Sequence, residues 1–226
     1  MNLIVTQRHT ENEYGDWTDS LENAYVSTFE NAGFTLFPIS NSFGSVESFL
    51  TKVDYHGILL TGGGDVGVDK TRGIGPNQRD QLEFSLLEYA VKLKVPVFGI
   101  CRGMQSINSY FGGDLERNIR ELDQNNVHAT PSRHQVRIFD TKVVSELNGD
   151  KKVEVNSYHD HGVTIDGKGE KLSVFAFFEP LNLVEGLYHE EFPIAAVQWH
   201  PEREERLQRI DSILLEAFKN KELFWK

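Results

Sequence analysis

The sequence predicts an α/β fold with a mixed, mostly parallel central sheet flanked by helices. From residue 1 to about residue 113, short β-rich runs alternate with amphipathic stretches, which is typical of βαβ units. Beyond residue 113 the helical periodicity fades, and short alternating segments indicate antiparallel strands. Because no interdomain linker separates the two halves, we expect one domain over residues 1–226.

Four strands are predicted in the first half, at residues 3–6, 35–39, 57–60 and 95–100, because each run is short and bounded by turn formers. Apolar residues at helical spacing predict a helix between the first two strands, with Thr18 as N-cap and Gly33 as C-cap. A second helix is predicted at residues 78–94. Its inner stripe would consist of Leu82, Ser85, Leu86, Tyr89 and Ala90.

The second half predicts further strands near residues 135–139, 152–155, 163–165, 172–178, 183–188 and 194–198, where short runs alternate in polarity. Residues 206–218 predict a C-terminal helix with one apolar face. We expect these strands to extend the sheet of the first half.

Composition excludes several classes of partner. The formal net charge of −11, from 23 basic and 34 acidic residues, would repel a nucleic-acid backbone over most of the surface. No apolar run approaches the roughly 20 residues of a membrane span, and the first residues lack the pattern of a secretory signal. We therefore expect a cytoplasmic protein that binds a small molecule. The sequence leaves a homodimer open.

The chain has a single cysteine, Cys101, which excludes an intrachain disulfide and a multi-thiolate zinc site. It lies in Gly99-Ile100-Cys101-Arg102-Gly103, between a predicted strand and a helical pattern, and so at a sharp strand-to-helix turn. Glycines permit close packing at this turn, and the start of the next helix favours a thiolate. A buried structural cysteine is the alternative, but the turn favours a nucleophile.

Among eight histidines, His200 is the best candidate for the base that a nucleophile needs. It ends a predicted strand, and Pro201 fixes the backbone after it. The Glu202 carboxylate could accept the second imidazole N–H and select the tautomer that faces the thiol. Taken alone, this motif also fits an ordinary turn.

Three consecutive glycines, Gly62, Gly63 and Gly64, follow another predicted strand at the same sheet edge. Backbone N–H groups that no side chain hinders could point into a cleft there. Gly63, together with the N–H of Arg102, would form an oxyanion hole. A plain flexible turn is the alternative.

Together these motifs resemble the class I glutamine amidotransferase family, and within it the γ-glutamyl hydrolase (peptidase C26-like) branch. LLTGGGDV is similar to the oxyanion segment, PVFGICRGMQSINSYFGG to the nucleophile turn with its helix, and AAVQWHPE to the His-Glu segment. The resemblance covers nearly the whole chain. It implies a flavodoxin-like sheet and a triad in which Cys101 is the nucleophile, His200 the base and Glu202 the orienting residue. We expect no cofactor.

Two further segments match this branch. The stretch 156–159 resembles the segment that holds the glutamyl α-amino and carboxylate groups, and Gln105 follows the nucleophile by one helical turn. The predicted substrate contacts are Gly62, Gly64, Gln105, Asn156, Ser157, Tyr158 and His159. His161 stands where the branch commonly has Gln, which leaves the leaving group open. His159 and His161 could share a metal ion, but no further ligand cluster accompanies them, and we expect no metal.

The leading hypothesis is a stand-alone hydrolase that cleaves a γ-glutamyl amide through a γ-glutamyl thioester. The resemblance favours γ-glutamyl-CDP-amidate, an intermediate of capsule phosphoramidate assembly, over γ-glutamyl polyamine derivatives. Lys70, Arg72 and Arg79 could meet its diphosphate. A glutaminase subunit of a two-chain amidotransferase and a catalytically silent binding protein are the alternatives.

A predicted long loop follows the first strand. Its side chains are either solvated or in contact with the leaving group. The residues concerned are Arg8, His9, Tyr14 and Trp17.

Overall fold

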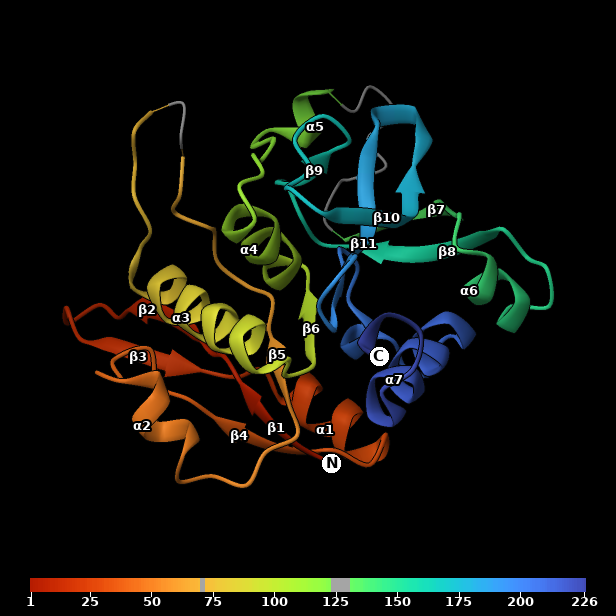
Figure 1. The fold of residues 1–226 in the computed structure, drawn as a ribbon. Coiled ribbons are helices and arrows are strands. Elements are labelled where there is room, and N and C mark those ends of the chain that lie inside the picture. The colour runs from red at the N-terminus through yellow and green to blue at the C-terminus, as the bar shows by residue number, and fades with distance from the viewer. Residues whose placement is uncertain (70–71, 123–130) are drawn as a thin grey trace.

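The computed structural model describes residues 1–69, 72–122 and 131–226 (Figure 1). Its main feature is a ten-stranded sheet with the order β4-β1-β5-β6-β12-β11-β10-β7-β8, in which β9 also pairs with β11. The parallel strands are β1 (Asn2–Val5), β4 (Thr35–Pro38), β5 (Gly57–Leu60), β6 (Val97–Ile100) and β12 (Ile194–Val197). The antiparallel strands are β7 (Ser132–Ile138), β8 (Lys152–Ser157), β9 (Val163–Thr164), β10 (Leu172–Phe178) and β11 (Leu183–His189).

The predicted α/β class and mixed sheet are confirmed, and β12 is where the two halves of the sheet join. β12 runs parallel to β6 on one side and antiparallel to β11 on the other. The last strand of the sequence therefore lies beside the strand that leads to Cys101. This register brings segments that are distant in the sequence to the same sheet edge.

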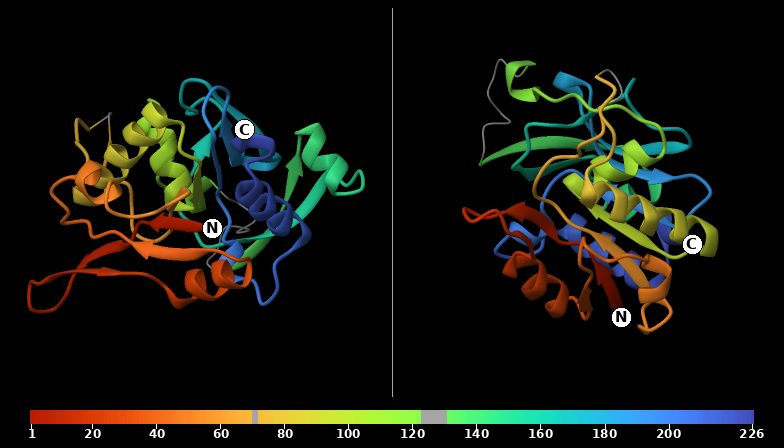
Figure 2. Two further views of the ribbon diagram at one scale, coloured as in Figure 1. Left: turned by 60° about the horizontal axis from the view of Figure 1, so that its bottom comes forward. Right: turned by 90° about the vertical axis from the view of Figure 1, so that its left-hand side faces the viewer.

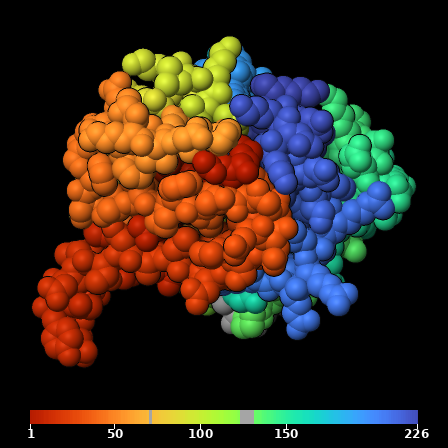
Figure 3. Space-filling view, turned by 90° about the horizontal axis from the view of Figure 1, so that it is seen from below, coloured from red at the N-terminus to blue at the C-terminus, as the bar shows by residue number. Residues whose placement is uncertain are grey.

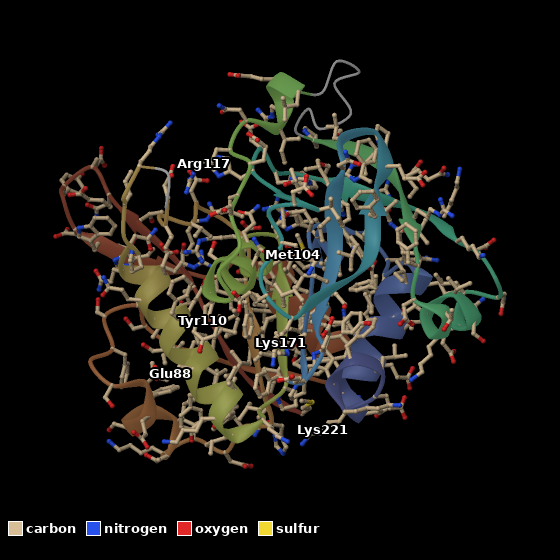
Figure 4. All side chains as sticks on the ribbon, turned by 45° about the horizontal axis from the view of Figure 1, so that its top comes forward. Glu88, Met104, Tyr110, Arg117, Lys171 and Lys221 are labelled. Atoms are coloured by element: carbon tan, nitrogen blue, oxygen red, sulfur yellow. The ribbon has the colours of Figure 1, made fainter. Side chains whose placement is uncertain are left out.

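Helices cover both faces of the sheet (Figure 2). Phe29 and Phe218 pack on one face with Phe98, whereas Leu86 and Met104 pack on the other. Met104, which Figure 4 labels, is fully buried. The helices are α1 (Asn23–Asn31), α2 (Val46–Leu50), α3 (Gln78–Leu93), α4 (Arg102–Tyr110), α5 (Ile119–Leu122), α6 (Thr141–Glu146) and α7 (Arg209–Asn220). Short 3₁₀ helices are η1 (Glu179–Leu181), η2 (Pro201–Arg203) and η3 (Leu223–Trp225).

Residues 8–20 form a β-hairpin, so the prediction of a long loop is wrong. β2 (Arg8–Glu11) pairs antiparallel with β3 (Trp17–Ser20), and the tip of the hairpin projects from the rest of the molecule (Figure 3). Thr18 pairs with Thr10 in this hairpin and is not a helix N-cap. α1 instead begins after Glu22, and Gly33 lies one residue beyond the C-cap with a φ of 84°.

The buried face of α3 differs from the predicted stripe. Its apolar residues Leu82, Leu86 and Ala90 are buried as predicted, but Ser85 is exposed and Tyr89 is only partly buried. Three charged residues, Arg79, Asp80 and Glu83, are buried instead. Their ion pairs with each other and with α4 allow this burial.

Arg117 connects the loop after β5 to the segment that follows α4 (Figure 4). Its guanidinium donates to the carbonyl oxygens of Val66, at 3.2 Å, and Val68, at 2.5 Å. No helix in the described ranges is both long and apolar enough to cross a bilayer.

Helix α4 approaches β5 so closely that only glycine fits at position 103. A Cβ added to Gly103 would overlap the carbonyl oxygen of Leu60. On the strand side, a Cβ at Gly99 would meet Ile107 and Ala196. The two glycines therefore set how tightly the strand-to-helix turn packs on the sheet.

We expect Gly103→Ala to lower the free energy of unfolding by about 1–3 kcal/mol, because overpacking against backbone atoms forces the helix away from β5. Urea denaturation measures the change. Gly44→Ala is the control, since nothing lies within 4 Å of a Cβ at Gly44. Equal stabilities of the two variants would contradict the close approach.

Candidate active site

Cys101 lies between β6 and α4 in a strained backbone conformation, with a φ of 52° and a ψ of −105°. Its backbone N–H donates to the carbonyl oxygen of Val197 on β12 at 2.8 Å. Its carbonyl oxygen accepts hydrogen bonds from the N–H groups of Met104 and Gln105. The side chain is 7% exposed. The predicted strand-to-helix turn is thus present, and it directs the thiol to the carboxyl edge of the sheet.

His200 lies three residues after the end of β12 and is clamped by Asn156 of β8. The His200 N–H donates to the Asn156 side-chain oxygen at 2.8 Å, and the Asn156 amide donates back to the His200 carbonyl at 2.8 Å. The imidazole Nδ1 lies 2.5 Å from a carboxylate oxygen of Glu202. Glu202 therefore orients the ring, and Nε2 is the nitrogen left to face a thiol.

Cys101 and His200 both lie against Gly62. A Cβ added to Gly62 would be 2.9 Å from the imidazole Cε1 and 3.4 Å from the Cβ of Cys101. Burial of the imidazole disfavours its protonated form, but Cys101 and Glu202 outweigh burial and raise the pKa of His200 to about 10. At neutral pH the imidazole therefore holds a proton that it could donate.

Tyr25 of α1 joins the glycine segment to the His-Glu pair. The N–H of Gly62 donates to the Tyr25 hydroxyl at 2.7 Å, and that hydroxyl lies within the electrostatic influence of Glu202. Burial, followed by the charge of Glu202, raises the pKa of Tyr25 well above its usual value. Because the Gly62 N–H is occupied, Gly63 is left as the candidate oxyanion donor in this segment. Gly63 has a φ of 82° and Gly64 a φ of 73°.

A buried network of four charges supports both predicted oxyanion donors. The Arg79 guanidinium donates to the carbonyl oxygens of Thr61, at 2.7 Å, and Gly63, at 2.6 Å, and to Glu83 at 2.9 Å. The Arg102 side chain pairs with Glu83 and with Asp80. The glycine segment and the residue after Cys101 are thus bound to the same helix, α3.

These contacts change the predicted role of the basic residues. Arg79 is 4% exposed and its donors bind the protein itself, so it cannot meet a diphosphate as predicted. Arg72 has a side chain that is 74% exposed and lies 3.6 Å from Asp69. Lys70 lies outside the described residues.

The structure places the predicted substrate contacts around the same edge but gives several of them protein partners. Asn156 holds His200, as described. Gln105 donates to the carbonyl of His161 at 2.9 Å and to Gln198 at 3.2 Å. Ser157 is fully buried, and the Tyr158 ring meets His200 edge-on, with centroids 5.5 Å apart. Their contact with substrate stays a prediction.

His159 is buried beside Glu185, with 3.8 Å between its Nε2 and the carboxylate, and its Nδ1 lies 3.1 Å from the His161 carbonyl. His161 turns toward Asp65, at 3.5 Å. The two imidazoles therefore have separate acidic partners. Within residues 1–69, 72–122 and 131–226, no group of three His, Cys, Asp or Glu side chains is arranged to hold a metal ion.

The hairpin lies beside the glycine segment. His9 stacks on Trp17 with ring centroids 4.6 Å apart, and Asp19 fixes its Nδ1 at 2.8 Å. A cavity of about 250 Å³ separates this ring pair from Gly63, Gly64 and the start of α3. Trp17 is 60% exposed, whereas Tyr14 is at the exposed tip.

Sequence reasoning missed Tyr25 and Glu83 as parts of the site. Tyr25 lies within the helix predicted between the first two strands, and no motif marks its hydroxyl. Asp80 did carry a signal, because the Arg79-Asp80 pair is usual in the γ-glutamyl hydrolase branch, whereas Glu83 has no motif that marks it, although it lies one turn after Arg79 on the same side of the helix.

Comparison with known proteins identifies the family. The model of the family described as Peptidase C26 matches residues 3–202. A Schizosaccharomyces pombe protein named as a glutamine amidotransferase, PB2B2.05, is 34% identical over 65% of this chain, and this match spans only 61% of that protein's length. The γ-glutamyl-γ-aminobutyrate hydrolase PuuD of Escherichia coli K12 is 28% identical over 90% of this chain and 87% of its own.

The fold agrees with these relatives. A glutamine amidotransferase from Thermotoga maritima superposes with a TM-score of 0.60 at 16% identity, over 97% of this chain and 83% of its own. This likeness supports the architecture alone, whereas the match over residues 3–202 identifies the family. The chain belongs to the Peptidase C26 family, within the class I glutamine amidotransferase-like proteins.

Proposed function

We propose that this protein hydrolyses a γ-glutamyl amide with Cys101 as nucleophile, His200 as acid and base, and Glu202 as the orienting carboxylate. The observation that carries the proposal is the buried imidazole of His200, which lies between Glu202 and Cys101 and whose pKa is raised to about 10. Family membership supports a γ-glutamyl hydrolase or amidotransferase-like activity.

In the proposed reaction the Cys101 thiolate attacks the γ-carbonyl carbon, and the oxyanion accepts hydrogen bonds from the N–H groups of Gly63 and Arg102. The C–N bond breaks as His200 protonates the leaving nitrogen, and a γ-glutamyl thioester remains. His200, now neutral, takes a proton from water, which attacks the thioester. Glutamate and the thiolate are released, and the imidazole is again protonated.

The principal candidate substrates are γ-glutamyl amides of two acidic amines. The name of the E. coli relative includes γ-aminobutyrate, and sequence resemblance favours cytidine diphosphoramidate, the product of γ-glutamyl-CDP-amidate in capsule phosphoramidate synthesis. Glutamine is the substrate if the chain is instead the glutaminase subunit of an amidotransferase. The rate of glutamate release from γ-glutamyl-γ-aminobutyrate, γ-glutamyl-CDP-amidate and glutamine, each at the same concentration, ranks these candidates.

We expect Cys101→Ser to lower kcat for γ-glutamyl amide hydrolysis at least about a thousand-fold, because the hydroxyl lacks the reactivity of the thiolate. Wild-type protein mixed with substrate and quenched in acid should gain the mass of one γ-glutamyl group, and the variant should not. An unchanged thermal midpoint shows that the variant is folded. A Cys101→Ser protein with wild-type activity would rule out the nucleophile.

The pH dependence should follow His200. Its raised pKa means that the acid form persists at neutral pH and is lost as the pH rises through about 10, so kcat/KM should fall on that alkaline side. In Glu202→Gln the imidazolium loses its carboxylate partner, so the pKa of His200 falls and the alkaline limb moves to lower pH. Profiles of kcat/KM between pH 6 and pH 10.5 measure the shift. An unmoved limb in Glu202→Gln contradicts the assigned pair.

Arg79 should act on the oxyanion donors through the carbonyl groups that it binds. Arg79→Lys keeps a positive charge near Glu83, but an ammonium cannot span the carbonyls of Thr61 and Gly63 as the guanidinium does. We expect kcat to fall about tenfold or more while KM changes less than about threefold. Arg72→Lys, at an exposed position, is the control. A loss that appears only in KM would contradict this role.

A further inference from the structure

Arg8 of the hairpin packs directly on the candidate oxyanion glycine. A Cβ added to Gly63 would overlap the Nε, Cζ and Nη2 atoms of the Arg8 guanidinium. Gly62, the preceding residue, contacts both Cys101 and His200. The Arg8 guanidinium therefore packs on Gly63, the neighbour of the glycine that contacts the proposed catalytic pair.

The guanidinium is only partly used by the protein. Its Nη2 lies 2.9 Å from a carboxylate oxygen of Glu22, and its side chain is 39% exposed. In the described part of the chain, Nε and Nη1 of Arg8 make no hydrogen bond. A guanidinium with two unused donor positions at the edge of a site is suited to bind a carboxylate or phosphate oxygen.

Arg203 shares Glu22 with Arg8, so two cations face one carboxylate. Arg203 Nη2 lies 3.1 Å from both oxygens of Glu22, and its guanidinium stacks on Tyr158 at 4.5 Å from the ring centroid. Tyr158 in turn meets His200. Arg203 also lies 3.9 Å from Glu202, so it is shared between two carboxylates, and Arg8 is the cation of this cluster that keeps unused donors.

The position of His200 decides which part of a substrate meets this cluster. His200 is the proposed acid, so the leaving nitrogen must face it. From His200, Tyr158 and Arg203 lead to Glu22 and Arg8, so groups attached to that nitrogen can extend toward Arg8 at the base of the hairpin. An acidic group on the leaving amine would reach the free donors of Arg8.

We propose that Arg8 is a specificity-determining residue that binds an anionic group of the leaving amine, so that the preferred substrates are γ-glutamyl amides of acidic amines. This inference rests on the proposed hydrolase function. The anion is a carboxylate if the amine is an amino acid, and a phosphate oxygen if it is a phosphoramidate. In both cases the recognition is charge-assisted hydrogen bonding to a guanidinium.

The test compares γ-glutamyl-γ-aminobutyrate with γ-glutamyl-butylamine, a neutral analogue of similar length, and with γ-glutamyl-CDP-amidate. In Arg8→Gln we expect kcat/KM to fall about 10- to 100-fold for the acidic substrates, mainly through KM, and to change less than about threefold for the neutral analogue. A larger loss of kcat/KM for γ-glutamyl-γ-aminobutyrate identifies a carboxylate as the anion that Arg8 binds, and a larger loss for γ-glutamyl-CDP-amidate identifies a phosphate oxygen. Arg8→Lys should recover part of the preference, because charge remains without the planar fork.

Two controls separate this role from others. Arg137→Gln removes an exposed cation that pairs with Glu179 in the other half of the sheet, and it should leave the ratio of the substrates unchanged. Tyr14→Ala alters the exposed tip of the hairpin without touching Arg8, and it should leave the ratio of kcat/KM for the acidic and neutral substrates unchanged.

Equal losses for acidic and neutral substrates in Arg8→Gln would overturn the proposal and point to the glutamyl α-carboxylate or to support of Gly63. A wild-type enzyme that does not prefer the acidic amides would overturn it as well. If the wild type releases no glutamate from any of the three amides, the hydrolase function itself fails, and the role of Arg8 fails with it.

Discussion

The left-handed backbone of Cys101 is the constraint on which the site depends. A non-glycine residue with a φ of 52° costs about 1–3 kcal/mol, and such a conformation persists only when the surroundings fix it. Here the Cys101 N–H is bound to β12, and Gly103 allows α4 to lie on β5. The same two contacts bring Cys101 next to the glycine segment and next to β12, the strand that leads to His200.

The network of buried charges formed by Arg79, Asp80, Glu83 and Arg102 holds the peptides of the glycine segment in a fixed orientation. Backbone N–H groups can stabilise an oxyanion only when their peptides are held in one orientation, yet a run of three glycines has little intrinsic rigidity. Arg79 supplies that rigidity by holding the carbonyl side of the peptides, and Glu83 and Asp80 balance the charges of Arg79 and Arg102. The site thus places two arginines and two carboxylates in the interior without a net charge.

The sequence allowed the sheet, the strand-to-helix turn and the helix α3 to be predicted, because each has a local pattern of apolar residues and turn formers. The hairpin could not be predicted in the same way, since its strands from Arg8 and Trp17 are polar and largely exposed and lack an apolar alternation. The inward charges of α3 were missed because polar residues on a helix usually face solvent. The Asn156 clamp on His200 depends on pairing between distant strands, which no local pattern specifies.

The hairpin forms its own two-stranded sheet and pairs with no strand of the main sheet in the described structure. Mutations, insertions or deletions in it can therefore accumulate during evolution without shifting the register of the strands that carry the proposed catalytic residues. Descendants of one ancestral gene could exchange substrates by altering a surface appendage while inheriting the same chemistry. Divergence among relatives should then concentrate in this appendage, and hybrid proteins with exchanged hairpins offer a direct route to redesigned selectivity.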